Sequence, residues 1–77
     1  MNTLIDTPAS ARHAHGQIVV TMGSGIENLF PCSAYPRLAK ATDKERANME
    51  LSPLGIHWPD IDEDLSVRGL LRDYGKR

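Results

Sequence analysis

The chain has 77 residues, of which 40% are hydrophobic and 25% are charged, and its formal net charge is −1. This length supports one small domain, and the balanced composition excludes a disordered chain. A net charge near zero excludes an overall field that attracts nucleic acid or an anionic membrane. The sequence contains no apolar run of the ~20 residues that a membrane span requires, and the lone Cys32 excludes an internal disulfide. We therefore expect a one-domain cytoplasmic protein.

The first half of the chain predicts a β-hairpin. Residues 1–16 show no sustained period, so we expect a poorly ordered segment with a weak strand at residues 10–13. Residues 17–22 (QIVVTM) are rich in β-branched side chains, and residues 26–30 follow a Gly-Ser-Gly link, which together predict two paired strands. Pro31 ends the second strand because it has no amide hydrogen to continue the ladder.

Two short helices are predicted next. Apolar residues from 34 to 41 recur at spacings of four and three, which indicates a helix over residues 33–40 with Pro36 in its first turn. Residues 42–45 (TDKE) match a capping box, in which a threonine hydroxyl accepts from the third amide and a glutamate accepts from the cap amide. We therefore expect a second helical turn over residues 43–48.

The last third of the chain predicts short strands, an acidic turn and a final helix. Residues 49–52 and 56–58 alternate between polar and apolar types, so we expect both to pair with the hairpin and enlarge its sheet. Residues 60–64 contain four carboxylates and predict a turn, after which Ser66 can cap a helix. The predicted domain covers residues 17–74, and residues 75–77 form a tail.

The predicted fold class is therefore α+β. A small antiparallel sheet, made of the N-terminal hairpin and one or two short strands, packs with two to three short helices. Trp58 is the only tryptophan and the best candidate for a core anchor. His57 should point to the opposite side of its strand, because successive side chains alternate. The candidate structural residues are Ile56, Trp58, Leu70 and Leu71.

The acidic stretch has the first letters of a calcium loop. Asp60, Asp62 and Asp64 alternate as in an EF-hand, where side chains at such spacing converge on one cation. The sixth position of that loop requires glycine and is Leu65, and the twelfth requires glutamate and is Leu71. The sequence therefore predicts an acidic turn and no metal.

Other reactive side chains lack the partners that catalysis requires. Cys32 and His57 would have to meet as a thiolate–imidazole pair, but a lone cysteine after proline is typical of a packed thiol. His13 and His15 have no third ligand nearby and are interpreted as part of a polar terminus. We expect no cofactor and no catalytic residue, and hence a protein that is not an enzyme.

Two charged clusters are candidate binding surfaces, although solvated helix faces are the simpler interpretation of the basic one. An acidic cluster accelerates association with a positively charged protein. The candidate partner-binding residues are Asp60, Asp62, Glu63, Asp64 and Arg68. A nucleic-acid-binding regulator is the alternative, less favoured because nearby carboxylates offset the charge and few aromatic residues are available for stacking. Its candidate residues are Arg37, Lys40, Lys44 and Arg46.

The sequence resembles a small prokaryotic family called domain of unknown function 2442. The resemblance covers residues 17–71 and rests on AYPRL at residues 34–38, AT at 41–42, RAN at 46–48 and, above all, GIHWPDIDEDLSVRGLL at 55–71. Two departures are Met49, where the family usually has tryptophan, and Gly-Ser-Gly at residues 23–25, where it usually has Asp-Gly-Arg.

This resemblance implies a compact α+β fold with no established catalytic residue. Members of the family often occur beside genes for small toxin-like proteins, which implies an antitoxin-like role. The hypothesis is that the chain binds and regulates another protein, such as a toxin-like gene neighbour. Self-association into a homo-oligomer is left open.

Overall fold

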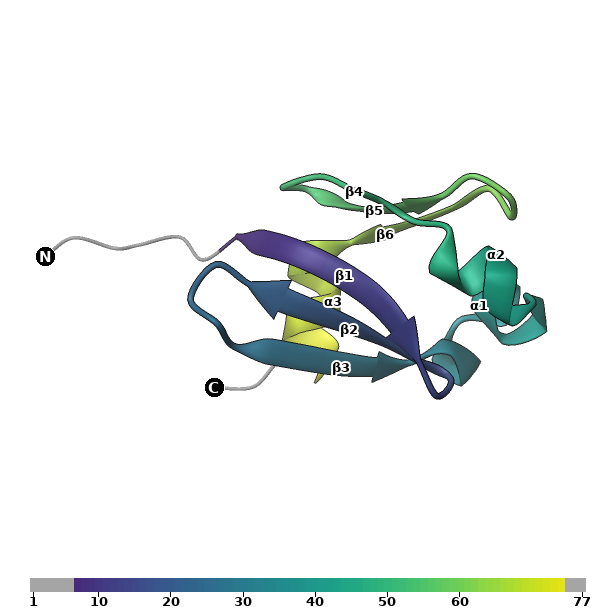
Figure 1. Cartoon of the computed structure of the whole chain (residues 1–77), viewed down its shortest axis with the longest axis horizontal. Coiled ribbons are helices and arrows are strands. Elements are labelled where there is room, and N and C mark those ends of the chain that lie inside the picture. The colour runs from purple at the N-terminus through teal and green to yellow at the C-terminus, as the bar shows by residue number, and fades with distance from the viewer. Residues whose placement is uncertain (1–6, 75–77) are drawn as a thin grey trace, which may run out of the picture.

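The computed structural model describes residues 7–74, which form two three-stranded antiparallel sheets and three short α-helices (Figure 1). The first sheet has the order β1 (Pro8–Ala14), β2 (Gln17–Met22), β3 (Glu27–Pro31). The second has the order β4 (Glu50–Leu51), β5 (Gly55–Trp58), β6 (Glu63–Ser66). The helical elements are the 3-10 turn η1 (Cys32–Ala34), α1 (Pro36–Lys40), α2 (Asp43–Ala47) and α3 (Val67–Tyr74). The predicted α+β class is confirmed.

The first sheet is a three-stranded meander. The predicted hairpin is present as β2 and β3, and the weak strand expected at residues 10–13 is the longer β1, which pairs with β2. His15 and Gly16 connect β1 to β2 with φ of 52° and 74°, the left-handed pair that a two-residue hairpin turn requires. The start of the predicted N-terminal segment, residues 1–6, and the predicted tail, residues 75–77, lie outside the described residues.

The second sheet differs from the expectation that the short strands would extend the hairpin. β4 and β5 pair with each other, and β5 pairs on its other side with β6. We expected residues 63 and 64 in a turn, but they begin β6, because Leu65 faces the core beside Ile56. The polar–apolar alternation of this strand is hard to detect in the sequence, because two carboxylates precede Leu65. The acidic turn is therefore limited to residues 59–62.

Side-chain caps begin α2 and α3 as predicted. In the capping box of α2, the Glu45 amide donates to the Thr42 hydroxyl at 3.1 Å and the Thr42 amide donates to the Glu45 carboxylate at 2.9 Å. At the start of α3, the Gly69 amide donates to the Ser66 hydroxyl at 3.2 Å. Both caps satisfy amides that a helix start leaves without intrahelical partners.

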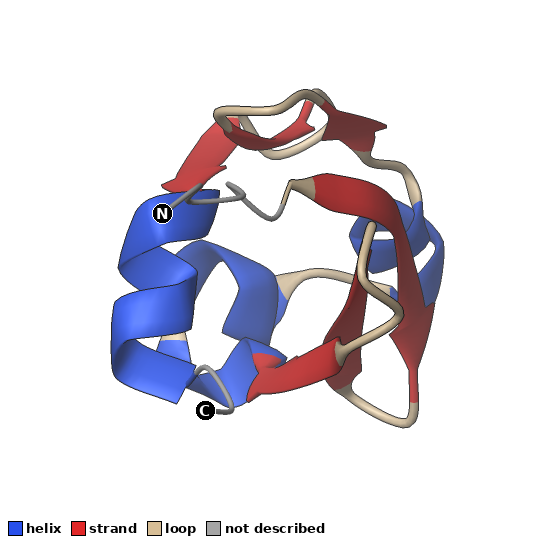
Figure 2. Ribbon diagram, turned by 90° about the vertical axis from the view of Figure 1, so that its left-hand side faces the viewer, coloured by secondary structure: helices blue, strands red, loops and turns tan. Residues whose placement is uncertain are grey.

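The core lies between the two sheets and α3, which are arranged around it in Figure 2. β2 and β3 contribute Ile18 and Phe30, and the predicted anchors Ile56 and Trp58 are 1% and 0% exposed. Leu70 is also buried, whereas Leu71 is only partly buried against this core. The indole nitrogen of Trp58 donates to the Arg46 carbonyl at 3.0 Å, so its polar atom is satisfied inside the core.

Candidate functional site

The five predicted partner-binding residues do not form one cluster. Asp60 and Asp62 lie in the turn between β5 and β6, Glu63 and Asp64 lie in β6, and Arg68 lies in the first turn of α3. Because β6 separates the turn from α3, Arg68 lies about 13 Å along the strand from the acidic turn. The structure therefore divides the predicted surface between the two ends of β6.

The acidic turn is fixed to the helical region. The Asn48 side-chain amide donates to the Asp60 carboxylate at 3.0 Å, and the Arg37 guanidinium donates to the backbone carbonyl of Asp62. Asp62 itself has a φ of 51°, a left-handed conformation that aspartate tolerates better than most residues. These contacts hold the turn beside α1 and α2 and leave both aspartates on the surface.

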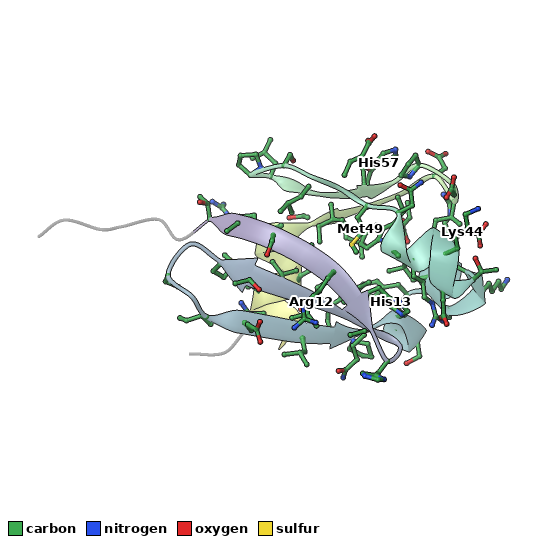
Figure 3. All side chains as sticks on the ribbon, in the orientation of Figure 1. Arg12, His13, Lys44, Met49 and His57 are labelled. Carbon is green, nitrogen blue, oxygen red and sulfur yellow. The ribbon has the colours of Figure 1, made fainter. Side chains whose placement is uncertain are left out.

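The outer face of the second sheet carries a row of polar, titratable side chains. Glu50, His57 and Asp64 are cross-strand partners on β4, β5 and β6. His57 Nδ1 lies 2.8 Å from Asp64 Oδ1. Figure 3 shows His57 on the side of the sheet that faces away from the first sheet, while Met49 points between the sheets. The prediction that His57 points away from the core is confirmed.

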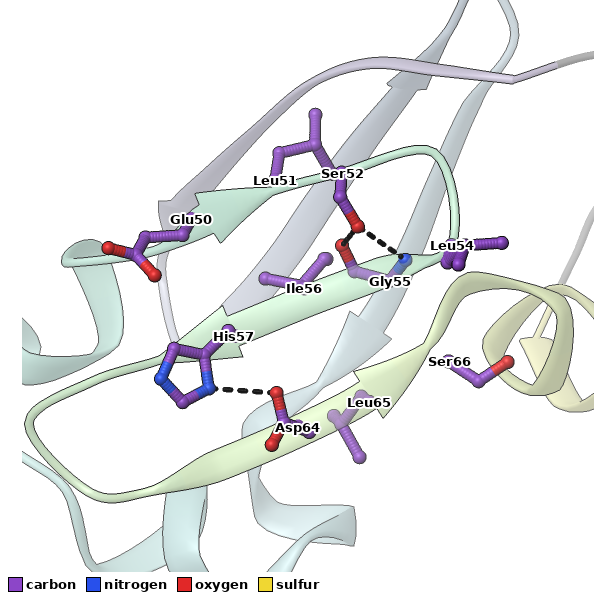
Figure 4. Close-up of a pocket in the computed structure, with 10 residues that line it drawn as sticks. All are labelled: Glu50, Leu51, Ser52, Leu54, Gly55, Ile56, His57, Asp64, Leu65 and Ser66. Carbon is purple, nitrogen blue, oxygen red and sulfur yellow. Dashed lines mark hydrogen bonds and ion pairs between the residues drawn. The ribbon is translucent and has the colours of Figure 1, made fainter.

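A shallow depression on this outer face runs from His57 and Asp64 to Ser52 and Leu54 (Figure 4). The Ser52 hydroxyl donates to the Gly55 carbonyl and accepts from the Gly55 amide, both at 3.2 Å. Ser52 pairs with Gly55, two residues along the strand from His57, which places it about 7 Å from the histidine row. A serine nucleophile must lie within hydrogen-bond reach of its base, so the arrangement suits recognition better than nucleophilic catalysis.

Gly55 is required by the close approach of β6. A Cβ at this position would lie 2.5 Å from the backbone carbonyl oxygen of Leu65, closer than any packed side chain tolerates. The glycine therefore allows β5 and β6 to pair at the end of the sheet that leads into α3. This gives a structural reason for the glycine that begins the GIHW stretch.

A second, more apolar depression lies where the β4–β5 turn meets the start of α3. We name it the Leu54 surface, defined by Pro8, Pro53, Leu54, Arg68 and Leu71. Leu54 is 84% exposed and lines both depressions. Sequence reasoning did not identify Pro53 or Leu54. The available signal was a leucine between proline and glycine in a tight strand connection, a position that the core does not reach.

The predicted nucleic-acid-binding cluster is partly used within the fold. Arg46 Nε donates to the Leu38 carbonyl at 2.9 Å, and Nη2 donates to the Ala39 carbonyl at 3.2 Å, so this guanidinium caps the end of α1. It also pairs with Asp43, and its side chain is only 17% exposed. Arg37 holds the acidic turn, as described above. Lys40 and Lys44 are exposed, and Figure 3 shows Lys44 on α2.

His13 and Cys32 are both enclosed by the fold. The interpretation of His13 as part of a polar terminus is wrong, because its side chain is 10% exposed and Nε2 lies 4.0 Å from Asp43 Oδ1 on α2. That distance is too long for a hydrogen bond, and within residues 7–74 Nε2 has no hydrogen-bond partner. Cys32 is 0% exposed, and burial raises the pKa of its thiol. The thiolate that nucleophilic chemistry requires is therefore disfavoured at this position.

Residues 7–74 contain neither a candidate metal-binding cluster nor a helix that could span a membrane. Within that range, no group of three or more histidine, cysteine, aspartate or glutamate side chains is arranged to hold a metal ion. None of the helices between residues 7 and 74 is long and apolar enough to cross a membrane.

Comparisons with known proteins agree with the resemblance seen in the sequence. No curated protein matches the chain. A crystal structure at 2.75 Å resolution of a protein of unknown function from Rhodospirillum rubrum is similar, with a TM-score of 0.83 and 26% sequence identity over 96% of this chain and 94% of that one. Residues 8–75 match the family described as protein of unknown function DUF2442. Because this match covers most of the sequence, the chain belongs to the DUF2442 family.

Proposed function

We propose that this chain is a non-enzymatic module that binds and regulates another protein through the Leu54 surface. The observation that carries the proposal is the 84% exposure of Leu54 between two depressions. Single exposed leucines are common, but Leu54 is joined by Pro8, Pro53 and Leu71 in one apolar area. Burying such an area against a partner is favourable at about 25 cal/mol per Å².

Charged groups beside this area can orient the partner. Arg68 lines the apolar depression itself, while Glu50 and Asp64 line the neighbouring one with His57. Charges at the rim of an interface contribute more to orientation and association rate than to affinity. A fitting partner therefore has an apolar pocket for Leu54, a carboxylate opposite Arg68, and basic groups opposite Glu50 and Asp64. Asp60 and Asp62 extend the acidic area at the other end of β6.

A toxin-like gene neighbour is the proposed partner. The support comes from the resemblance to the DUF2442 family, whose members often occur beside genes for small toxin-like proteins. Binding at the Leu54 surface would then neutralise or regulate the neighbour, which is an antitoxin-like role. No step of this role requires a catalytic group or a cofactor from this chain.

Co-purification tests the proposal directly. The tagged chain is co-expressed with its genomic neighbours, and the retained proteins are identified and tested for toxicity alone. We expect one neighbour to be retained, and Leu54→Ala to weaken its binding about tenfold or more, as expected for a central apolar anchor. Ile26→Ala is the matched control, because Ile26 is also exposed but lines neither depression. Retention of no neighbour, or equal binding by both variants, contradicts the proposal.

The basic cluster supports a second function less well. Of its four residues, Arg37 and Arg46 bind backbone carbonyls of the fold, which leaves Lys40 and Lys44 for phosphate contacts. With two phosphate contacts, affinity for duplex DNA would fall with a log–log salt slope of about −2. A gel shift repeated at several salt concentrations distinguishes this regulator from the protein-binding module.

A further inference from the structure

The imidazole of His57 is held in one orientation by Asp64. His57 Nδ1 lies 2.8 Å from Asp64 Oδ1. Because a carboxylate only accepts hydrogen bonds, Nδ1 carries the hydrogen of this contact, and a neutral imidazole then has its lone pair on Nε2. Figure 4 shows Nε2 directed away from Asp64, and it makes no hydrogen bond within residues 7–74. His57 therefore presents a hydrogen-bond acceptor to the depression on the outer face of the second sheet.

The pairing of β5 with β6 brings Asp64 close to this imidazole. The Val67 amide donates to the Leu54 carbonyl at 3.1 Å, which extends the ladder between the two strands. Because hydrogen-bonded pairs alternate in an antiparallel ladder, His57 and Asp64 form a non-hydrogen-bonded pair. Cα atoms in such pairs lie about 4.5 Å apart, with the side chains close together. The short contact at Nδ1 follows from this register.

The pairing of β5 with β4 leaves a wider gap between His57 and Glu50. The Ser52 amide donates to the Gly55 carbonyl at 2.9 Å, so the pair of His57 and Glu50, two residues along, is also a hydrogen-bonded one. Cα atoms in such pairs lie about 5.5 Å apart. One ammonium group can bridge two acceptors across a gap of this size, because each of its hydrogen bonds measures about 2.8 Å.

The charged groups around His57 are carboxylates. Glu50 faces it from β4 and Asp64 from β6, and Asp60 and Asp62 lie in the turn that connects β5 to β6. α3 packs against the core-facing side of β5, and none of its charged side chains lines this depression. No lysine or arginine of residues 7–74 lines it. The depression is therefore complementary to a positively charged group.

We propose that this depression binds one ammonium group, supplied by a lysine of the partner protein, and releases it when His57 is protonated. This inference rests on the proposed protein-binding function and adds the chemistry and the regulation of one contact. An ammonium group has three N–H donors and no acceptor. Two of its donors bind His57 Nε2 and the Glu50 carboxylate, and the third remains for water. Asp64 fixes the imidazole and adds negative charge.

Protonation of His57 reverses this recognition. Histidine is the side chain that ordinarily changes its charge between pH 5 and 8. The imidazolium carries a hydrogen on both nitrogens, so Nε2 becomes a donor and cannot accept from an ammonium group. The two positive charges also repel each other at this distance. The contact between Nδ1 and Asp64 is kept in both states, so the change affects binding without requiring a change in the fold.

Affinity at two pH values tests the inference. A gene neighbour retained in the co-purification is titrated into the full chain by isothermal titration calorimetry at about pH 7.5 and about pH 5.5, between which histidine changes charge. We expect the Kd to rise about fivefold or more at the lower pH. His57→Gln keeps an acceptor but does not titrate, so its Kd should be within about threefold of the original at both pH values.

The variant separates His57 from other sources of pH dependence. If titration of the partner causes the effect, the rise in Kd persists in His57→Gln, and the inference is overturned. A Kd of the original protein that does not change with pH also overturns it, while weaker binding by Leu54→Ala in the same experiment leaves the proposed function standing. Retention of no neighbour overturns both. Circular dichroism melting at each pH verifies that the variants are folded.

Removal of either charge tests the ammonium contact. Glu50→Gln should raise the Kd about fivefold at the higher pH, because it removes the carboxylate that the ammonium group binds. Glu27→Gln is the matched control, since Glu27 is also an exposed glutamate on a strand but does not line the depression. Acetylation of the partner's lysines should abolish the pH dependence. Equal effects of the two variants, or a pH dependence that survives acetylation, contradict the proposed contact.

Discussion

The two sheets of this protein differ in what holds them together. In the first sheet, β2 is buried on both sides, with Ile18 and Val20 in the core and Val19 under the outer face. In the second sheet, the outer face is polar, and its strands have two, four and four residues. The first sheet is therefore stabilised by burial of apolar area, whereas the second depends on turns, the contact between His57 and Asp64, and a few inward residues.

This difference fits the proposed division of the chain into a structural part and a partner-binding part. Substitutions on the outer face of the short second sheet should cost little stability, because only Ile56, Trp58 and the neighbouring inward side chains pack in the core. Such surfaces are suited to partner binding, because binding residues commonly lie on loops that a rigid scaffold holds in place. The first two predictions below test whether the second sheet depends on its inward residues in this way, and the last two concern the helical segment between the sheets.

Trp58→Ala should have the largest effect on stability. It removes a fully buried indole and leaves the Arg46 carbonyl without its donor. Large-to-small changes of this type cost about 3–5 kcal/mol, which is comparable with the whole stability of a domain of this size. We expect urea denaturation to find the variant largely unfolded, and Trp58→Phe to retain a cooperative transition. A melt of Trp58→Ala close to that of the original protein would contradict the assignment of Trp58 to the core.

Gly55→Ala should have the next largest effect on stability. Its Cβ would meet the Leu65 carbonyl oxygen at 2.5 Å, so β5 and β6 would have to separate. We expect a loss of about 1–3 kcal/mol in the free energy of unfolding, as for other forced overpacking. Gly69→Ala is the matched control, because its nearest heavy atoms lie at 3.8 Å and helix propensity favours alanine. If both variants had equal stability, the close approach would not constrain the second sheet.

Thr42→Ala should have a smaller effect, confined to the segment between the sheets. It removes the hydroxyl that accepts from the Glu45 amide, while the Glu45 carboxylate still accepts from the amide of residue 42. Loss of an N-cap costs about 1 kcal/mol, and we expect that value from chemical denaturation. Thr42→Ser keeps the acceptor and should be close to neutral. A loss of equal size in both variants would assign the effect to the threonine methyl group.

Replacing Cys32 should have the smallest effect on stability, and its pH-dependent part should appear only at high pH. Burial raises the pKa of its thiol above the ordinary value of 9.0, so the unfolded chain releases the proton first as pH rises. The thiol therefore stabilises the fold fully below pH 9 and progressively less above it. We expect the unfolding free energy of the original protein to fall relative to that of Cys32→Val as the pH rises above 9. A constant difference across that range would contradict the shift.

Much of the fold could be predicted from the sequence, because the signals for it are local. QIVVTM between glycines predicted the hairpin, and TDKE predicted the cap of α2, since each depends on neighbours within a few residues. β6 was missed because Leu65 is its only apolar residue among two carboxylates and a serine. The separate second sheet was missed because strand pairing is decided by tertiary contacts.

The candidate site was less predictable than the fold. The acidic residues could be predicted from the sequence. Their separation from Arg68 could not, because it depends on the extended strand β6 that lies between the acidic turn and α3. The Leu54 surface brings together residues from β1, the β4–β5 turn and α3, which are distant in sequence. Arg46 binds the Leu38 and Ala39 carbonyls because α2 packs beside α1. The sequence does not show this packing, so Arg46 was predicted to lie on a charged surface.

The central claim is that the Leu54 surface, built from the β4–β5 turn, the start of α3 and Pro8 of β1, binds a partner. Amide chemical-shift mapping of the labelled chain, titrated with a gene neighbour retained in the co-purification experiment, tests this claim most directly. The account predicts the largest shifts at Leu54, Arg68 and Leu71, with Ile26 and Thr21 unchanged. Shifts centred on Lys40 and Lys44, with none at Leu54, would contradict it.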